Sequence, residues 1–310
     1  MIKRLFIITV VQYSTGSATV CLVYSMLKCW INWIGTLSPT TLMTTKSVVP
    51  ESVASDMSKA TQYPDPDITA RARRAFNTFV ANDFPPGPKF LPMFVMINLQ
   101  KGGTLPFCLA LMMYYENWSA PCLLYTASHG TYGIVWLLKH VAFRDAGWDT
   151  RQTFLGAING FLAVLGPYWV APWLLISGRA PAASNAQCVV AMGISTLGMV
   201  IMIAADAQKH FTLKYKRGLI TTGMFALVRH PNYAGEMLIY GGFAAMVGHW
   251  APWLILFWVW IQLFHTNMMY KEARMSRYPG WAAYRAKTGL LVPWIPSLFV
   301  STEDQKSKIN

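Results

Sequence analysis

Charged side chains are scarce in this sequence. Asp, Glu, Lys and Arg together make up 13% of the 310 residues, about half of the ~25% that is typical of soluble globular domains. Hydrophobic residues make up 54% and stand in long runs with few charges between them. This composition excludes an ordinary soluble protein and indicates an integral membrane protein, whose main partner is the lipid bilayer.

Acidic residues are scarcer than basic ones. The sequence has 13 Asp and Glu against 26 Lys and Arg, which gives a formal net charge of +13. An excess of this kind can serve nucleic-acid binding, but the basic residues cluster between and after the apolar runs. Cytoplasmic loops that face anionic lipid explain this distribution better, so we expect no nucleic-acid partner.

Cysteine is also sparse, and no two cysteines form a C-x-x-C pair. The five cysteines stand singly in apolar surroundings: Cys21, Cys29, Cys108, Cys122 and Cys188. This spacing excludes a zinc cluster and suggests no disulfide framework, and we expect no metal site. Strand-like alternation and internal repeats are absent from the sequence as well. The fold class that we predict is therefore all-α, a polytopic membrane helix bundle.

Residues 1–90 form the first predicted region. Residues 5–11 and 20–33 are apolar and follow a charged start, which is typical either of a cleaved signal peptide or of an uncleaved first span, the option that we favour. Residues 38–61 predict a polar loop or, after a signal, a plastid-type transit segment. Residues 67–84 have the pattern of a short basic amphipathic helix, which would lie on the membrane surface or pack on the rest of the protein.

Residues 91–300 form the predicted membrane domain, and residues 301–310 are polar and predict a disordered tail. The apolar runs of this part of the chain are residues 90–99, 105–115, 121–138, 154–176, 187–205, 237–247 and 253–264. Several are shorter than the ~20 residues of a perpendicular span, so we expect some to be paired hairpin halves or re-entrant pieces buried in protein. The resulting prediction is six or seven transmembrane helices.

The densest group of polar residues in the second half includes Arg229-His230-Pro231-Asn232 and Glu236. Pro231 suits the first turn of a helix, so a helix is predicted to begin there. Arg229 and His230 would then stand ahead of a helix N-terminus, which favours an anion. Asn232 and Glu236 share one face of this helix and predict a cofactor edge. The alternative is a capped helix end beside a cytoplasmic basic loop.

A second group lies inside an apolar run. His129, Tyr132, Trp136 and Lys139 follow the spacing i, i+3, i+7, i+10, so they line one face of a helix. One interpretation is a functional cluster opposite the polar helix end, and the other is a buried His and a Tyr that only pack.

A third group, which contains Glu272 and Arg274, emerges from the final apolar run. It indicates either a solvated basic helix or a basic wall around a dianionic cofactor.

The motif Arg229-His230-Pro231-Asn232-Tyr233-x-Gly235-Glu236 resembles the C-terminal domain of the steroid 5-alpha-reductase family, and most closely a branch of unknown function. The accompanying matches are Asp206-x-Gln208-Lys209, Glu272, Tyr278-Pro279, Tyr284 and the ending Leu-Val-Pro-Trp-Ile-Pro. The resemblance is specific over residues 206–296 and looser upstream to about Tyr125. The wider superfamily includes sterol reductases, isoprenylcysteine carboxyl methyltransferases and phospholipid methyltransferases.

Two residues distinguish the reductases from the methyltransferases in this motif. The methyltransferases typically carry no acid after the glycine, whereas this sequence has Asn232 and Glu236. The resemblance therefore implies a reductase that binds NADPH, and the alternative cofactor is S-adenosylmethionine. The basic cluster before the motif also favours a dianionic phosphate over an adenosyl cation.

The resemblance further implies that Asn232 and Glu236 hold the nicotinamide-ribose end, and that Asp206 and Arg229 line the cofactor cavity. Other basic positions are assigned to phosphates on charge alone. The full predicted cofactor-binding set is Asp206, Lys214, Arg217, Arg229, Asn232, Tyr233, Glu236 and Arg274.

In steroid 5-alpha-reductases a Tyr in a His-Tyr segment polarises the substrate carbonyl, and the nearest counterpart here is His129-Gly-Thr-Tyr132, where the two are not adjacent. This implies Tyr132 as the catalytic acid, with His129 or Glu236 to orient its phenol, and Tyr233 or Tyr270 as substitutes.

The predicted function is NADPH-dependent reduction of a C=C bond in a lipophilic sterol, steroid, prenoid or enoyl-lipid substrate, in the endoplasmic reticulum or a plastid membrane. The alternatives are an S-adenosylmethionine-dependent lipid or isoprenylcysteine methyltransferase, and a non-catalytic lipid-binding membrane protein.

Overall fold

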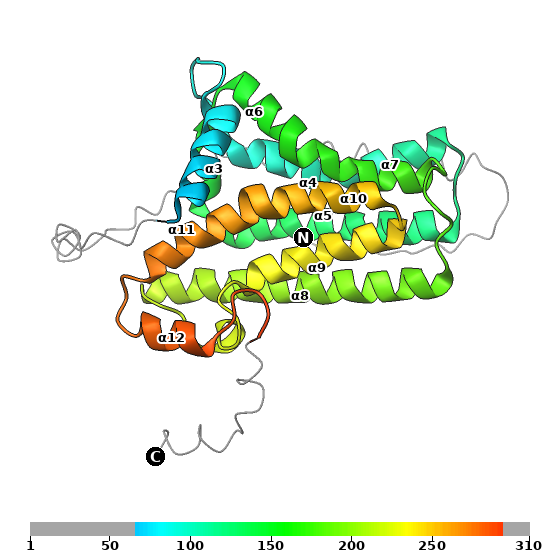
Figure 1. Cartoon of the computed structure of the whole chain (residues 1–310). Coiled ribbons are helices and arrows are strands. Elements are labelled where there is room, and N and C mark those ends of the chain that lie inside the picture. Colours follow the sequence, from blue (N-terminus) through cyan, green and yellow to red (C-terminus); the bar gives the residue numbers. More distant parts are fainter. Residues whose placement is uncertain (1–65, 294–310) are drawn as a thin grey trace, which may run out of the picture. The chain divides into compact units, whose positions relative to one another are not determined.

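The computed structural model describes residues 66–293, and this part of the chain is almost entirely helical (Figure 1). Its strands are a single short antiparallel pair, β1 (Leu91–Pro92) and β2 (Arg151–Gln152). The all-α prediction is therefore confirmed for the described residues. The predictions of a first span, a polar loop and a disordered tail fall outside them.

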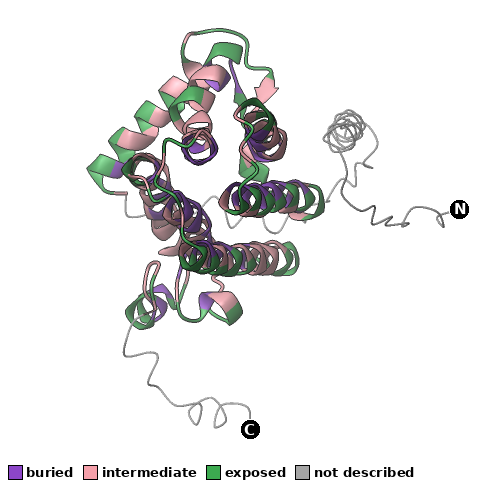
Figure 2. Cartoon of the chain, turned by 90° about the vertical axis from the view of Figure 1, so that its right-hand side faces the viewer, coloured by how far each residue is buried: buried purple, intermediate pink, exposed green. Residues whose placement is uncertain are grey.

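The helices follow the apolar runs. In chain order they are α3 (Ile68–Thr78), η2 (Phe79–Asp83), α4 (Met93–Tyr114), α5 (Ala120–Phe143), η3 (Ala146–Asp149), α6 (Phe154–Gly160), η4 (Phe161–Leu165), η5 (Gly166–Trp169), α7 (Val170–Ile176), α8 (Asn185–Tyr215), η6 (Gly223–Phe225), α9 (Pro231–Val247), α10 (Trp250–Val259), η7 (Trp260–His265), α11 (Thr266–Met275) and α12 (Trp281–Lys287). Figure 2 shows buried positions on the sides that face neighbouring helices and exposed positions on the outer sides.

Three helical stretches of the described chain are long and apolar enough to cross a membrane. They are Met93–Tyr114, Phe154–Ile176 and Asn185–Tyr215, which agrees with an integral membrane protein. The apolar runs 90–99 and 105–115 are not two hairpin halves, because α4 continues through the polar residues between them. The count of six or seven spans stays a prediction.

Helices α8 and α9 lie side by side at very short range (Figure 1). The approach depends on glycines: a Cβ atom added to Gly235 would lie 2.6 Å from the backbone N of Met202 and 2.7 Å from the carbonyl O of Gly198. A Cβ atom on Gly198 would lie 2.6 Å from the carbonyl O of Gly235. The two backbones are therefore in direct contact, and this contact sets Asp206 of α8 close to Glu236 of α9.

We expect Gly235→Ala to destabilise the protein by about 3 kcal/mol, because backbone atoms cannot move aside for the added methyl group as a flexible side chain can. The measurement is the free energy of unfolding in detergent. Gly193→Ala in the same α8 is the matched control, since a Cβ there meets nothing within 4 Å and Ala favours helix. Equal stability of the two variants would contradict the packing argument.

Helix α3 packs through its polar side. Arg73 Nε donates to Thr266 Oγ1 at 3.0 Å, and Asn77 Nδ2 donates to the carbonyl O of Gln262 at 2.8 Å. The large apolar residues of this segment point the other way, since Ile68 is 69% and Phe76 54% exposed. In the structure α3 thus contacts the rest of the protein with its polar side and leaves its apolar side outward, and its place on the membrane surface stays a prediction.

Candidate functional site

Lys101, near the middle of α4, is a buried cation at the centre of the described structure. Its side chain is 6% exposed, and its Nζ donates to the phenol oxygen of Tyr132 at 3.0 Å and to that of Tyr240. Tyr132 comes from α5 and Tyr240 from α9. Lys101 can lie next to Tyr132 because the following residue of α5 is Gly133. A Cβ atom at that position would collide with the carbonyl O of Lys101.

Aromatic rings enclose the Lys101 ammonium. Its Nζ lies 4.5 Å from the ring centre of Tyr132, 4.8 Å from that of Trp136 and 4.6 Å from that of Tyr240. The ring of Tyr168 stacks on that of Tyr240 at 4.1 Å. The face of an aromatic ring attracts a cation, so these rings compensate for part of the hydration that the buried Lys101 ammonium has lost. Within residues 66–293 no carboxylate forms an ion pair with Lys101.

Sequence reasoning did not select Lys101. A signal was present, because a lone Lys among apolar residues at membrane depth is a functional candidate by default. The polar and glycine residues around Lys101 separate two apolar runs, and this break obscures the signal.

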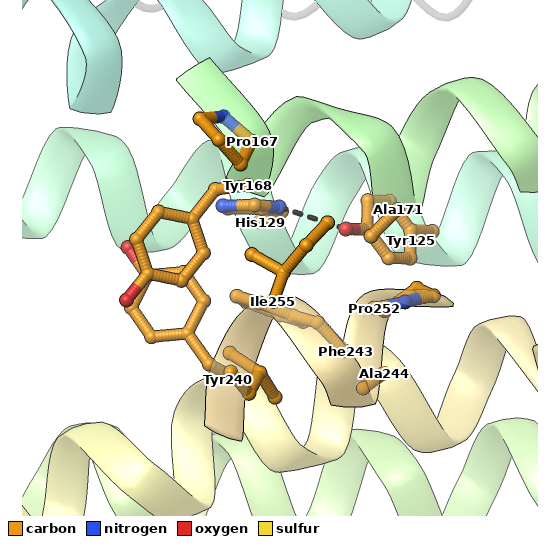
Figure 3. Close-up of a pocket in the computed structure, with 11 residues that line it drawn as sticks. Tyr125, His129, Pro167, Tyr168, Ala171, Tyr240, Phe243, Ala244, Pro252 and Ile255 are labelled. Carbon is orange, nitrogen blue, oxygen red and sulfur yellow. Dashed lines mark hydrogen bonds between the residues drawn. The ribbon is translucent and has the colours of Figure 1, made fainter. Parts of the chain in front are cut away.

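His129 lies beside this cluster but is bonded elsewhere (Figure 3). Its Nδ1 is 3.1 Å from the phenol oxygen of Tyr125, and its ring stacks on Phe243 at 4.2 Å. The structure therefore gives the Tyr132 phenol Lys101 as its partner, where the sequence predicted His129 or Glu236. The His129 Nε2 is buried and has no hydrogen-bond partner among the described residues.

A small cavity adjoins His129. Its lining comes from α5, the η5–α7 stretch, α9 and α10 (Figure 3): Tyr125, His129, Pro167, Tyr168, Ala171, Tyr240, Phe243, Ala244, Pro252, Ile255 and Leu256. Its volume is about 10 Å³, room for about one water molecule. A lipid would have to displace these side chains in order to reach the phenols.

A charged layer follows one to two turns further along α5. Lys139 forms an ion pair with Asp206 of α8, and both side chains are nearly buried. Glu236 of α9 is half-buried and makes no hydrogen bond or ion pair with another described residue, although it interacts electrostatically with Lys101, Lys139 and Asp206. The structure thus brings Tyr132, Asp206 and Glu236 into one region through the packing of α5, α8 and α9.

Arg229 and His230 lie directly before α9, which begins at Pro231 as predicted. The Arg229 Nε donates to both carboxylate oxygens of Glu272 at 3.0 Å, and its Nη1 donates to the carbonyl oxygens of Arg285 and Thr288. His230 Nε2 lies 2.9 Å from Glu272 Oε1. These groups hold α9, α11 and the segment after α12 together, and they use donors of Arg229 that an anion would need.

This network sets the charge states of its members. Burial raises the pKa of Glu272, but hydrogen bonds from His230 and Arg229 outweigh burial and leave the pKa below its usual value of 4.5. Burial lowers the pKa of His230 below 6.5 despite the neighbouring Glu272. At neutral pH, Glu272 is therefore ionised and His230 is mostly neutral.

The remaining predicted residues lie near the surface. Asn232 and Tyr233 are half-buried on the first turn of α9, and the Lys271 Nζ lies 4.5 Å from the ring centre of Tyr233. Lys214 and Arg217 are exposed at the C-terminal end of α8 and just beyond it, and Arg274 is exposed in the last turn of α11. The structure does not bring these three cations into the buried cluster. In the described part of the chain, no group of three His, Cys, Asp or Glu side chains is placed to hold a metal ion.

Residues 140–288 match the model of a protein family of unknown function, DUF1295. The match covers slightly less than half of the chain and includes Asp206, the α9 motif and Glu272, but not Lys101 or Tyr132. The resemblance predicted from the motif is supported at this level, that of a family of unknown function. The relation to steroid 5-alpha-reductases stays a prediction.

A curated relative is similar over a shorter stretch. It is an uncharacterized protein of Schizosaccharomyces pombe, 29% identical over 89 residues, which are 28% of this chain and 32% of the relative. The matched region thus spans about a third of the relative's length, and the relative's name states no activity.

Proposed function

We propose that the protein is a membrane-embedded, NADPH-dependent reductase of a C=C bond in a lipophilic substrate. The observation that carries the proposal is a buried phenol, Tyr132, that is bonded to a cation inside an apolar bundle and stands near the half-buried carboxylate of Glu236. A proton donor in a water-poor site is what reduction of a polarised C=C bond requires.

The donor set fits the cofactor at one edge of α9. Asn232 and Glu236 are four residues apart on one face, half-buried, and their side chains make no hydrogen bond with another described residue. An amide and a carboxylate in this state are free to bind the hydroxyl and amide groups of a nicotinamide riboside. The exposed Lys214, Arg217 and Arg274 are the positions that we assign to its phosphates. Arg229 would support this edge by fixing the start of α9.

The residues of the chain would divide the chemistry as follows. Bound NADPH supplies the hydride. Tyr132 donates a proton to the substrate atom on which negative charge accumulates, and Lys101 stands behind that phenol. The apolar helices exclude water from the reaction.

We further infer six or seven membrane spans in the membrane of the endoplasmic reticulum, with a plastid membrane as the alternative. Among the described residues, the three candidate spans Met93–Tyr114, Phe154–Ile176 and Asn185–Tyr215 support this number, and the helical stretches α5, α9 and the continuous α10–η7 would supply three more. A seventh would come from the N-terminal segment.

Thermal unfolding of the detergent-purified protein tests the cofactor. A ligand that binds only the folded state raises its apparent stability, so we expect NADPH to raise the unfolding temperature. Glu236→Gln and Asn232→Ala should each weaken NADPH binding by roughly tenfold or more, because each removes a hydrogen-bonding partner or its charge.

Glu116→Gln, an exposed change in the turn between α4 and α5, is the control and should bind NADPH normally. If S-adenosylmethionine stabilises the protein and NADPH does not, the methyltransferase alternative replaces the reductase. If neither stabilises it, the non-catalytic lipid-binding alternative remains.

A further inference from the structure

The partners of Lys101 are unusual for a buried cation. Charged groups inside a membrane protein commonly pair with an opposite charge, but this ammonium bonds two neutral phenols and is enclosed by aromatic rings. The half-buried Glu236 interacts with it electrostatically without forming an ion pair. Holding a positive charge here is costly, so the arrangement calls for a role that needs the charge.

Packing does not supply that role. The close contact of α4 and α5 is made by the backbone of Lys101 against Gly133, and it is independent of the Lys101 side chain. An apolar side chain would fill the same space among Tyr132, Trp136 and Tyr240 without the cost of burying a charge.

Proton transfer makes use of the charge. When the Tyr132 O–H bond breaks and its proton passes to the substrate, a phenolate remains in an apolar interior. Next to Lys101, this step converts a cluster of net charge +1 into a neutral ammonium–phenolate pair, which a region of low dielectric favours. The phenolate then regains a proton from water after product release, and the cluster returns to its starting state.

We propose that Lys101 is the positioning residue of this site. Its ammonium holds the phenols of Tyr132 and Tyr240 and stabilises the phenolate left after proton transfer. The proposal rests on the reductase function for the identity of the reaction, whereas the Lys101–phenolate pairing can be measured without cofactor or substrate.

The test is the alkaline titration of tyrosinate absorbance in the full-length, detergent-purified protein, with circular dichroism to confirm that the helices persist. Lys101→Gln keeps hydrogen-bond donors beside the phenols but removes the charge, and Lys101→Arg keeps the charge. An opposite charge at this range commonly favours the ionised form by one pH unit or more. The tyrosinate of the site is assigned as the signal that is lost in Tyr132→Phe or Tyr240→Phe. We expect this tyrosinate to form about one pH unit higher in Lys101→Gln than in the native protein, and near the native value in Lys101→Arg.

Lys89→Met is the control, because Lys89 is exposed and pairs with Asp83, and its titration should equal that of the native protein. Identical titrations of Lys101→Gln and the native protein would overturn the proposal. It would also be overturned if neither Tyr132→Phe nor Tyr240→Phe lost a tyrosinate signal. If Lys101→Gln does not fold, the comparison of Lys101→Arg with Lys101→Met decides in the same way. Failure of NADPH to stabilise a protein in which the titration shift is present would overturn the reductase function and leave the pairing intact.

Discussion

Tyr132→Phe should leave NADPH affinity nearly unchanged and lower turnover by roughly 10²-fold or more. The substitution removes only a hydroxyl group, and we place this hydroxyl where charge develops during the reaction. Its effect should therefore fall on kcat rather than on cofactor binding. The measurement pairs NADPH titration with single-turnover oxidation of NADPH in the presence of a conjugated enone lipid.

Tyr114→Phe is the matched control, because its side chain is 80% exposed at the end of α4; its turnover should match that of the native protein. Full turnover by Tyr132→Phe would show that another group is the acid. Tyr240 would then be the first alternative, since it shares the Lys101 hydrogen bonds and lines the cavity, ahead of Tyr233 and Tyr270.

Glu272→Gln should destabilise the folded protein by about 3 kcal/mol or more. The change leaves the buried Arg229 guanidinium, 9% exposed, without its counter-ion, and breaking one side of a buried ion pair has a cost of this size. Asp149→Asn is the control, because its pair with Arg144 is exposed on both sides and such pairs contribute about 1 kcal/mol or less. Comparable losses in the two variants would refute a structural role for the Arg229–Glu272 pair.

Acidification should act on the same network. The folded pKa of Glu272 is below 4.5, so its contribution to stability is present above pH 4.5 and is lost as the pH falls through the folded pKa. The pKa of His230 is also lowered, from 6.5. As the pH falls, the His230 imidazole of the unfolded chain therefore takes up its proton at a higher pH than that of the folded protein. The free energy of unfolding begins to decline below pH 6.5 for this reason. In Glu272→Gln the part of this decline that belongs to the carboxylate should disappear.

The helices of this protein were largely predictable, because apolar runs and capping signals are local. Pro231 correctly marked the start of α9, and the spacing of His129, Tyr132 and Trp136 correctly placed them on one buried face of α5. The two apolar runs on either side of Lys101 form one helix, since helix geometry continues through Gly102 and Gly103, which pack in the bundle.

The pairings within the site could not be read from the sequence. Lys101 meets Tyr240 across 139 positions of the chain, and Arg229 meets Glu272 across 43. Such contacts depend on which helices are neighbours and at what distance, and a few glycines set that distance through backbone contact. Residue types and spacing indicate which side chains belong to a site, whereas the packing of α4 against α5 determines that Tyr132 bonds Lys101 instead of His129.

The outward apolar side of α3 leads us to expect that the Arg229–Glu272 pair lies near the surface of the membrane. The polar side of this helix is bonded to η7 and the start of α11, and its apolar side, with Ile68 and Phe76, points outward, as in a helix that lies at a membrane–water interface. Glu272 follows Thr266 by six residues of helix, about 9 Å. With the apolar side of α3 against the membrane, we expect the Arg229–Glu272 pair to lie at the level of the lipid headgroups, within reach of both water and the polar end of a lipid.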